Sequence, residues 1–442
     1  MTQVADLIQR EQGLRRQLTA GQMTMVAVGG SIGTGLLLGS AAAIGVAGPA
    51  VILTFIIAAF INWTVTRALG ELATRHPAAG SFRLYGDLYL NEWAGFLSGA
   101  GYWAAIAISI GAEMVASATY MAFWFPSVPA IAWIILASGL LLGVNLLSVG
   151  EYGRFEYGFA MIKVIVIAAF IVLGAALLLT GRTAPQYTAH GGFLPRGGLA
   201  LLLALPFALY TFAGVEFVAV TSGESRSVHE IARATRWTFL VLAAVYIGAI
   251  VVLTGVIPWD GTGVAESPFV TVFRRVNIPA ASHVMNFAVL TAALSGANAA
   301  LYSASRTLFS LARSGWAPAR LGILNRAGSP TSAVLVSSLP IALAVALERW
   351  APEAAFVSIL SAALFGLLLS WLVTLAAHVR FRGGAGAAPA SAVGFTLIVL
   401  CIAKTWWDSR LGFVSGLAYL LVLNAMYLAL KGSHRQRMLE SC

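Results

Sequence analysis

The stretch Gly29-Gly30-Ser31-Ile32-Gly33-Thr34-Gly35 lies inside a long apolar segment, and glycine returns at Gly39, Gly45 and Gly48. Seven glycines within twenty positions disfavour a continuous helix. The spacing suits close packing of helices through small residues. It equally suits an unwound segment whose backbone amides, near the positive end of the following half-helix, hold an anionic group. The stretch therefore predicts either a tight helix contact or a binding site made of backbone.

A second apolar segment carries a comparable interruption. It reads Leu205-Pro206-Phe207-Ala208-Leu209-Tyr210-Thr211-Phe212-Ala213-Gly214-Val215-Glu216. Pro206 removes one backbone donor, and Gly214 permits a break in the helix. Two interrupted segments of this kind predict two broken helices, rather than a single irregular contact between helices.

The composition is that of a membrane protein. Of the 442 residues, 59% are hydrophobic and 10% are charged, against roughly 25% charged in a soluble globular protein. The apolar residues form long runs, which exclude a barrel of alternating strands. The net charge of +10 forms no basic stripe, so we expect no nucleic acid partner. The cysteines and histidines are not spaced as metal ligands, so we expect no metal and no cofactor.

Twelve stretches are long enough to cross a hydrocarbon core of about 30 Å. They are residues 23–47, 50–72, 94–122, 131–148, 158–180, 198–221, 237–257, 281–311, 333–348, 354–379, 391–407 and 411–430. Together they predict an all-α integral membrane protein with one transmembrane domain, residues 23–430, between a tail of residues 1–22 and a tail of residues 431–442. The polar link 74–93 is amphipathic enough to lie at the membrane interface.

The distribution of basic residues predicts the orientation. Of the 27 Lys and Arg residues, we assign 18 to the side of the two termini, 6 to the opposite side and 3 to the spans. Because cytoplasmic loops carry the excess of Lys and Arg, both termini are expected in the cytoplasm.

The two interruptions fall in the first and sixth predicted spans. Because five is odd, spans 1–5 (about 23–180) and spans 6–10 (about 198–379) would enter the membrane from opposite sides as inverted repeats, with two extra helices at about 391–430. Inverted repeats place a binding site between the broken helices at the bilayer midplane. The first break would offer amides to a carboxylate and the sixth would offer carbonyls to an ammonium, which predicts an amino acid zwitterion as the ligand.

Ionisable residues lie within these spans, where each costs about 2.5 to 3.5 kcal/mol on insertion scales. Glu113 and Glu216 either tie helices together as protonated or hydrogen-bonded carboxyls, or act as proton or gating carboxylates. Lys163 either snorkels to the cytoplasmic surface or, with a charge that depends on access to water, carries the coupling proton. Arg67 and Glu71 are spaced i, i+4, which predicts an ion pair on a helix surface without a role in transport.

Further short motifs follow along most of the chain. They are Ala47-Gly48-Pro49, Gly70-Glu71-Leu72-Ala73, Pro77-Ala78-Ala79-Gly80-Ser81-Phe82, Ile162-Lys163-Val164, Gly223-Glu224, Ser267-Pro268-Phe269-Val270 and Leu290-Thr291-Ala292-Ala293-Leu294-Ser295-Gly296-Ala297-Asn298. In this order, with the glycine-rich stretch, they resemble the amino acid permeases of the amino acid–polyamine–organocation superfamily, especially its bacterial amino acid transporter family.

The resemblance implies the leucine-transporter-type fold of five plus five inverted helices with two more at the C-terminus, in a bacterial inner membrane, and proton-coupled amino acid uptake. The family's site for the substrate carboxylate maps to Ser31, Ile32, Gly33, Thr34 and Gly35. Its ammonium site and gate map to Phe212, Ala213 and Gly214. Lys163 matches a lysine that, in some relatives, takes the place of a sodium ion and carries the proton dependence.

The chain departs from the family at two points. Ala213-Gly214-Val215-Glu216 stands where the family usually has two glycines before Thr-Glu. Ser225-Arg226-Ser227 stands where Asn-Pro often follows Gly-Glu. The first departure lowers the polarity beside the substrate and favours a neutral amino acid.

These observations together predict symport of an amino acid with a proton into the cytoplasm. The bundle of spans 1, 2, 6 and 7 would rock against the remainder, giving alternating access to a site between the broken helices. Two alternatives stand beside this hypothesis: an exchanger that needs no proton, and a membrane sensor that binds an amino acid and signals through its cytoplasmic surface. We expect no enzymatic activity.

Overall fold

The computed structural model describes residues 18–78, 81–147, 152–276, 279–325, 328–383, 386, 388–408 and 410–440. Within these ranges the chain is helical, and its only extended pairing is a bridge between Leu18 and Ser225. Most of the predicted N-terminal tail and the last two residues of the C-terminal tail lie outside the described residues.

The first part of the chain contains the first predicted repeat. Its elements are α2 (Ala20–Ser31), η1 (Gly35–Gly39), α3 (Ser40–Ala47), η2 (Gly48–Ala50), α4 (Val51–Arg75), α5 (Ser81–Tyr89), α6 (Glu92–Ala122), α7 (Ala130–Leu147) and α8 (Tyr152–Leu179).

The second part of the chain contains the second predicted repeat and the extra helices. Its elements are α9 (Leu199–Thr211), α10 (Phe217–Val220), η3 (Thr221–Glu224), α11 (Val228–Val256), η4 (Trp259–Gly261), α12 (Pro268–Arg275), α13 (Pro279–Arg313), η5 (Ala319–Gly322), α14 (Thr331–Ser338), α15 (Ile341–Trp350), α16 (Pro352–Phe381), α17 (Ala388–Asp408) and α18 (Arg410–Glu440).

Each predicted span overlaps helical residues. By length and composition, seven stretches among the described residues can cross a membrane, and one of them, Ala20–Arg75, contains the first two predicted spans. Shorter apolar helices account for other predicted spans, and they are Ala130–Asn145, Leu199–Thr211, Ala388–Lys404 and Gly416–Gly432. The chain is therefore a multi-pass helical membrane protein.

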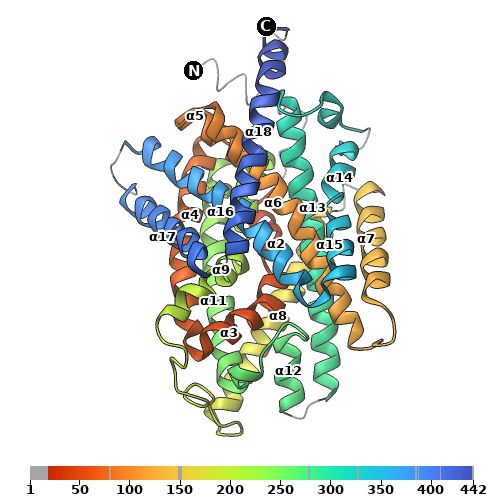
Figure 1. Cartoon of the computed structure of the whole chain (residues 1–442), viewed down its shortest axis with the longest axis vertical. Coiled ribbons are helices and arrows are strands. Elements are labelled where there is room, and N and C mark those ends of the chain that lie inside the picture. Colours follow the sequence, from red (N-terminus) through yellow and green to blue (C-terminus); the bar gives the residue numbers. More distant parts are fainter. Residues whose placement is uncertain are drawn as a thin grey trace.

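Helix α6 forms the centre of the molecule. It packs along α13 and α16, which lie beside it in Figure 1, while α4 packs against α11 and α9. Large aromatic side chains are fully buried in this core, among them Trp371, Tyr102 and Phe55. The central position of α6 matters for the site because its side chains face both interrupted helices.

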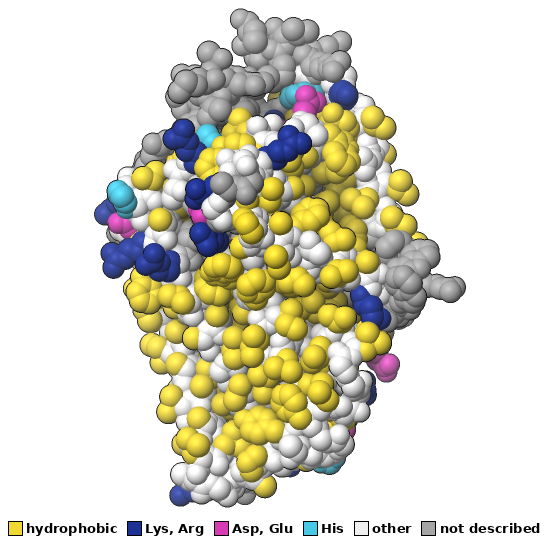
Figure 2. All heavy atoms as spheres, turned by 90° about the vertical axis from the view of Figure 1, so that its left-hand side faces the viewer, with side chains coloured by type: hydrophobic (Ala, Val, Ile, Leu, Met, Phe, Trp, Pro, Cys, Tyr) yellow, Lys and Arg dark blue, Asp and Glu magenta, His cyan; other side chains and the backbone are white. Residues whose placement is uncertain are grey.

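The outer surface suits a lipid environment. Large apolar side chains are exposed along α7, α8 and α18, for example Leu140, Val172 and Leu421. Figure 2 shows hydrophobic side chains over the middle of one face, with Lys and Arg gathered mainly toward one end. A contiguous exposed apolar belt of this kind marks a membrane-facing surface.

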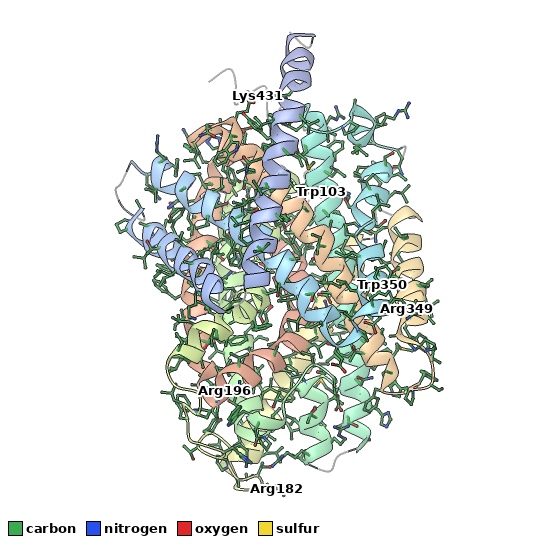
Figure 3. The ribbon with its side chains drawn as sticks, in the orientation of Figure 1. Trp103, Arg182, Arg196, Arg349, Trp350 and Lys431 are labelled. Carbon is green, nitrogen blue, oxygen red and sulfur yellow. The ribbon has the colours of Figure 1, made fainter. Side chains whose placement is uncertain are left out.

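The two ends of the molecule differ from this belt in charge. Lys431 lies at the end where α18 finishes and α5 is found, here called the terminal end (Figures 1 and 3). Arg182 and Arg196 lie at the opposite end, here called the far end (Figure 3). The short helix α5 occupies the link 74–93, as a separate amphipathic element of nine residues.

The helices add detail to the prediction at three points. Pro206 lies inside α9, and the helix continues past it to Thr211. The stretch 333–348 is two helices, α14 and α15, separated at Leu339 and Pro340. The predicted C-terminal tail from residue 431 continues the helix of α18 as far as Glu440.

Candidate functional site

The first helix is interrupted at the glycine-rich stretch. Helix α2 ends at Ser31, and Ile32 leaves the helical conformation with φ −80° and ψ 82°. The chain turns here: the amide of Gly33 donates to the carbonyl of Ser31 (3.0 Å), and helical structure resumes by Gly35. The amide of Ile32 still donates to the carbonyl of Val28 (2.9 Å), whereas the amides of Gly33 and Thr34 leave the regular helical ladder.

The second interruption lies between α9 and α10. Residues 212–216 form turns, and Gly214 has φ +104°, a conformation that suits glycine. The amide of Ala213 donates to the carbonyl of Tyr210 (2.9 Å), and that of Phe217 donates to Gly214 (2.9 Å). The helix breaks at the glycine and not at Pro206.

The two interruptions touch each other. A Cβ atom added to Gly214 would lie 2.8 Å from the Cα of Ser31. On the other side of the break, the Thr211 hydroxyl donates to the carbonyl of Gly35 (3.0 Å). Tyr246 of α11 also donates to the carbonyl of Ser31 (2.7 Å). The contact between the breaks depends on the absence of a side chain at Gly214.

Glu113 of α6 reaches into the first break. The backbone amide of Thr34 donates to its two carboxylate oxygens, at 3.2 and 3.3 Å. The carboxylate also lies against Gly33 and Gly296, where an added Cβ would stand 2.5 and 3.2 Å from its Oε1 atom. The Thr34 amide, which is expected to bind the substrate carboxylate, is thus able to bind a carboxylate. In this structure it binds the carboxylate of Glu113.

Lys163 lies on the opposite side of the same break. Its Nζ atom donates to the carbonyl of Gly29 (2.6 Å), and the residue is only 4% exposed. Helix α8 begins eleven residues earlier, at Tyr152, so the side chain does not snorkel to the surface. Its charge also acts on Glu113. A buried ammonium group thus donates to a carbonyl in the last turn of α2.

Glu216 is buried beside the second break. It is fully inaccessible, and neither carboxylate oxygen has a hydrogen-bond partner among the described residues. Burying an ionised carboxylate is costly unless hydrogen bonds or opposite charges offset the loss of water.

A cavity of about 40 Å³ lies between the breaks. Six of the predicted site residues line it, namely Ser31, Gly33, Gly35, Glu113, Ala213 and Gly214, while Ile32, Thr34, Phe212, Lys163 and Glu216 do not. The rest of its wall combines the small residues Ala105, Ser109, Gly296, Ala300 and Ala363 with the larger Ile106, Phe217 and Leu367. Gly296 belongs to a quoted motif, but nothing in the local sequence marks the wall residues of α6 and α16.

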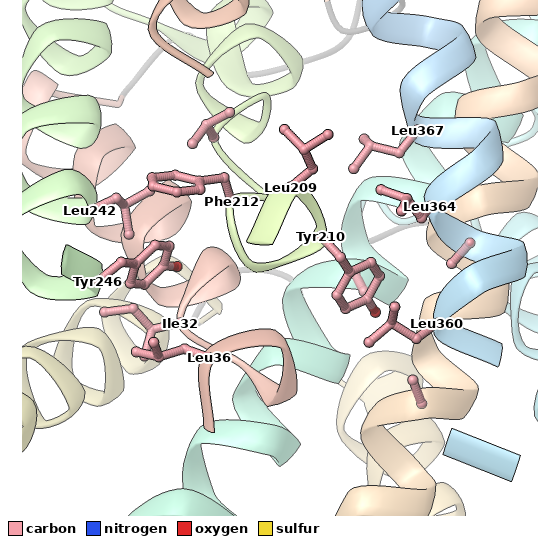
Figure 4. Packing of buried hydrophobic residues seen from close by; sticks show 14 of the residues in the cluster. Ile32, Leu36, Leu209, Tyr210, Phe212, Leu242, Tyr246, Leu360, Leu364 and Leu367 are labelled. Atoms are coloured by element: carbon pink, nitrogen blue, oxygen red, sulfur yellow. The ribbon is translucent and has the colours of Figure 1, made fainter. Parts of the chain in front are cut away.

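The aromatic residues near the second break point in different directions. Figure 4 shows Phe212 directed toward Leu242 and Tyr246, and Tyr210 directed toward Leu360 and Leu364 of α16. The rings of Phe212 and Tyr246 are 4.9 Å apart at 68°. Tyr210 lines the cavity and Phe212 does not. Phe217 of α10 lines the cavity as well, so Tyr210 and Phe217 are the aromatic residues of its wall.

Comparison with known proteins gives independent evidence about the family of this chain. A family model described as amino acid permease matches residues 22–402. The uncharacterized amino acid permease YtnA of Bacillus subtilis (strain 168) is 33% identical over 450 residues, covering 97% of each chain. The aromatic amino acid transport protein AroP of Escherichia coli (strain K12) is 37% identical over 382 residues, covering 85% of this chain and 83% of its own. AroP of Salmonella typhi is also 37% identical, over 383 residues.

Proposed function

Because this chain belongs to the amino acid permease family, and is thus a membrane protein of amino acid transport, we propose that it imports amino acids by proton symport and has no enzymatic activity. The proposed fold is twelve transmembrane helices in two inverted repeats of five, with α17 and α18 in addition. Its support is the position of the breaks, in the first and sixth predicted spans. The proposed location is a bacterial inner membrane with both termini in the cytoplasm.

The observation that carries the proposal is the hydrogen bond from the Thr34 amide to Glu113. An amide at a helix break binds anions because its N–H has no helical partner. We propose that the substrate carboxylate takes this amide when Glu113 moves away. The ammonium group would then face backbone carbonyls of the second break, beside Ala213 and Gly214.

Substrate binding requires the helices to move. A cavity of about 40 Å³ has room for a few water molecules at most, since one needs at least about 10–15 Å³ measured in this way. An amino acid fits only if α2, α4, α9 and α11 move away from α6, α13 and α16. Rocking of these two groups of helices would open the site to each side in turn, as in other transporters built from repeats.

The proposed substrate class is aromatic and other large neutral amino acids. AroP, by its name, transports aromatic amino acids. In this chain the cavity wall opposite the breaks includes the small residues Ala105, Gly296, Ala300 and Ala363 beside the larger Ile106 and Leu367. Once the helices separate, small residues leave room for a large side chain, with Tyr210 beside it for ring contacts.

Lys163 is the proposed carrier of the proton dependence. When charged, its ammonium group donates a strong hydrogen bond to the carbonyl of Gly29. When it loses its proton to water, that contact weakens and α2 is freer to move. We expect Lys163→Ala to abolish accumulation driven by a pH gradient while substrate binding persists. The measurement is uptake into proteoliposomes with an imposed inward proton gradient, beside a binding assay in detergent. Unchanged concentrative uptake by this variant would contradict the role.

The test of the whole proposal is uptake of a panel of labelled amino acids by proteoliposomes, with and without sodium. A neutral zwitterion moving with one proton carries one charge, worth about 2.3 kcal/mol at 100 mV, or about forty-fold accumulation. We expect accumulation of aromatic amino acids that collapses with a protonophore and ignores sodium. Uptake only into vesicles preloaded with amino acid would make the protein an exchanger. Binding without uptake would favour a sensor.

A further inference from the structure

A second, larger cavity lies on the outside of the molecule, away from the broken helices. It is a groove of about 630 Å³ between α4 and α11, here called the α4/α11 groove. Apolar side chains form part of its wall, including Trp63, Phe239 and Leu240. Arg67, Glu71 and Arg236 supply charge to the same wall. A large groove with both kinds of lining suits a ligand that is itself amphipathic.

The groove lies at the terminal end, toward the border of the apolar belt. Helix α4 ends at this end, because His76 just after α4 bonds to Tyr89 of α5 (2.7 Å). Helix α11 begins beside it, because the amide of Ala78 donates to Ser222 of η3 (3.2 Å), shortly before α11. Arg67 is eight residues before the last residue of α4, and Arg236 is eight residues after the first residue of α11. At 1.5 Å per residue, both lie about 12 Å from the helix ends. The two arginines therefore sit at similar depth on facing walls.

The floor of the groove is closed. A Cβ atom added to Gly70 would lie 2.6 Å from Cγ2 of Thr235, so α4 and α11 touch at this pair. The groove is thus a recess that opens outward and not a passage to the substrate site. Figure 2 shows the face that lies on the left of Figure 1, where α4 runs, with basic side chains above a hydrophobic surface.

The positive charge in the groove exceeds the negative charge. Glu71 is already held by His378 at Nε2 (2.9 Å) and by Nε of Arg382 (2.7 Å), both from outside the groove. Arg67 bonds to Glu71 at 3.3 Å with 44% of its side chain exposed, and its guanidinium lies over the Trp63 ring. Arg236 is exposed and has no ion pair or hydrogen-bond partner among the described residues. Donors of both arginines thus remain open to an anion.

We propose that the α4/α11 groove binds an anionic phospholipid of the cytoplasmic leaflet. The phosphate would lie between Arg67 and Arg236, whose guanidinium groups match phosphate oxygens in pairs. An acyl chain would lie along Trp63, Phe239 and Leu240, which are three to four residues, or about 5–6 Å, deeper than the arginines of the same helices. Basic pockets between helices on this side of a membrane are typical lipid headgroup sites. A free phosphate would leave the apolar wall unused, so the occupant is the lipid.

The bound lipid would also affect a link between helices. Its phosphate would draw Arg67 away from Glu71, and Glu71 would keep its bonds to His378 and Arg382 of the α16 end. Glu71 is therefore not left unpaired when Arg67 changes partner. The lipid would hold α4 and α11 together at their cytoplasmic ends without weakening the contact of α4 with α16.

The experiment measures lipid retention by the full-length protein. Purified protein in detergent is mixed with phosphatidylglycerol or phosphatidylethanolamine, and bound lipid is counted by native mass spectrometry. Each arginine near a lipid surface contributes a factor of about five in affinity. We expect wild type to prefer phosphatidylglycerol, Arg67→Gln and Arg236→Gln each to lose about fivefold, and the double variant to lose about twenty-five-fold.

The matched control is Arg233→Gln, which removes an exposed arginine of α11 that does not line the groove. It should retain phosphatidylglycerol as wild type does, and tenfold inorganic phosphate should not displace the lipid. Equal loss in the control, equal binding by the double variant, or displacement by inorganic phosphate would each overturn the proposal. If the double variant does not fold, Arg67→Lys with Arg236→Lys keeps the charge but loses paired hydrogen bonding, and reduced retention is again expected.

Discussion

Gly214 holds a backbone conformation, φ +104°, that other residues adopt only with strain, and it does so where the two broken helices meet. Glycine is favoured at this position for two reasons. A Cβ atom here would strain the backbone, and it would also collide with Ser31. Glu113 shows the complementary case, in which a long side chain fills a binding position. Its carboxylate accepts hydrogen bonds from the Thr34 amide, a donor that the break leaves outside the helical ladder.

The first prediction concerns Gly214→Ala. The positive φ costs roughly 1–2 kcal/mol for a residue with a Cβ atom, and the added Cβ would meet Ser31 at 2.5–2.8 Å. We expect a lower unfolding temperature and loss of most amino acid uptake, because the added Cβ atom would force the two breaks apart. The control is Gly139→Ala on α7, where an added Cβ meets nothing within 4 Å. Equal uptake by the two variants would show that the contact between the breaks is dispensable.

The second prediction concerns Glu113→Ala. Removing the carboxylate frees the Thr34 amide and removes a negative charge that repels the substrate carboxylate. A hydrogen bond to a charged group is worth about 1.5–3 kcal/mol, so we expect substrate binding to tighten by roughly tenfold while turnover falls. Binding is measured by calorimetry in detergent. Ser117→Ala, one turn further along α6 and outside the cavity, is the control. Weaker binding by Glu113→Ala would mean that Glu113 assists the substrate.

Among the elements, the helices show which local signals dominate. Proline inside α9 does not break it, whereas glycine with positive φ does, because a proline removes one donor while a helix of thirteen residues keeps the others. Glu71 shows that contacts with distant residues cannot be read from the neighbouring sequence. Its i, i+4 contact with Arg67 was predicted, but its stronger contacts are with His378 and Arg382, which lie more than three hundred residues away.

Helix α5 supplies the third prediction, which concerns pH. Burial raises the pKa of Asp87 from its ordinary value of 3.8 to about 6, although Arg83 bonds to it at 2.7 Å. The folded protein therefore binds this proton more tightly than the unfolded chain. The stability it contributes is present below pH 4 and is lost as pH rises through 6.

The expected result is a loss of about 1 kcal/mol in the free energy of unfolding of wild type between pH 5 and pH 7, relative to Asp87→Asn. Unfolding in detergent is followed at both pH values. Glu353→Gln, on an exposed side chain at the start of α16, should behave as wild type. Parallel curves for wild type and Asp87→Asn would rule out titration of Asp87 in this range.

At the scale of the whole molecule, charge and hydrophobicity define an orientation. An apolar belt separates the terminal end, which carries Lys431, from the far end, which carries Arg182 (Figures 2 and 3). The excess of Lys and Arg on the side of the termini predicts that the terminal end is cytoplasmic.

The last prediction tests this orientation with cysteine labelling. In a background of Cys401→Ser and Cys442→Ser, Arg182→Cys should react with an impermeant maleimide in intact cells. Lys431→Cys should react only after the membrane is permeabilised. The labelling of each variant with a permeant maleimide controls for expression and access. Reaction of Lys431→Cys in intact cells would reverse the proposed topology.

The sequence by itself determined the class of the protein, the approximate limits of its helices and the two interruptions. These features depend on local signals, which are apolar length, glycine density and the φ preference of glycine, and each can be read within one segment. The family motifs further indicated which residues to examine at the breaks.

Only the tertiary structure decided which of these residues share a cavity. It placed Glu113 on the Thr34 amide, Lys163 on the carbonyl of Gly29 and Tyr210 rather than Phe212 at the cavity. It also assembled a wall of small residues from α6, α13 and α16, and a groove from α4 and α11. Such contacts join residues that are far apart in the chain. Their positions depend on how whole helices pack and rotate, which no single segment encodes.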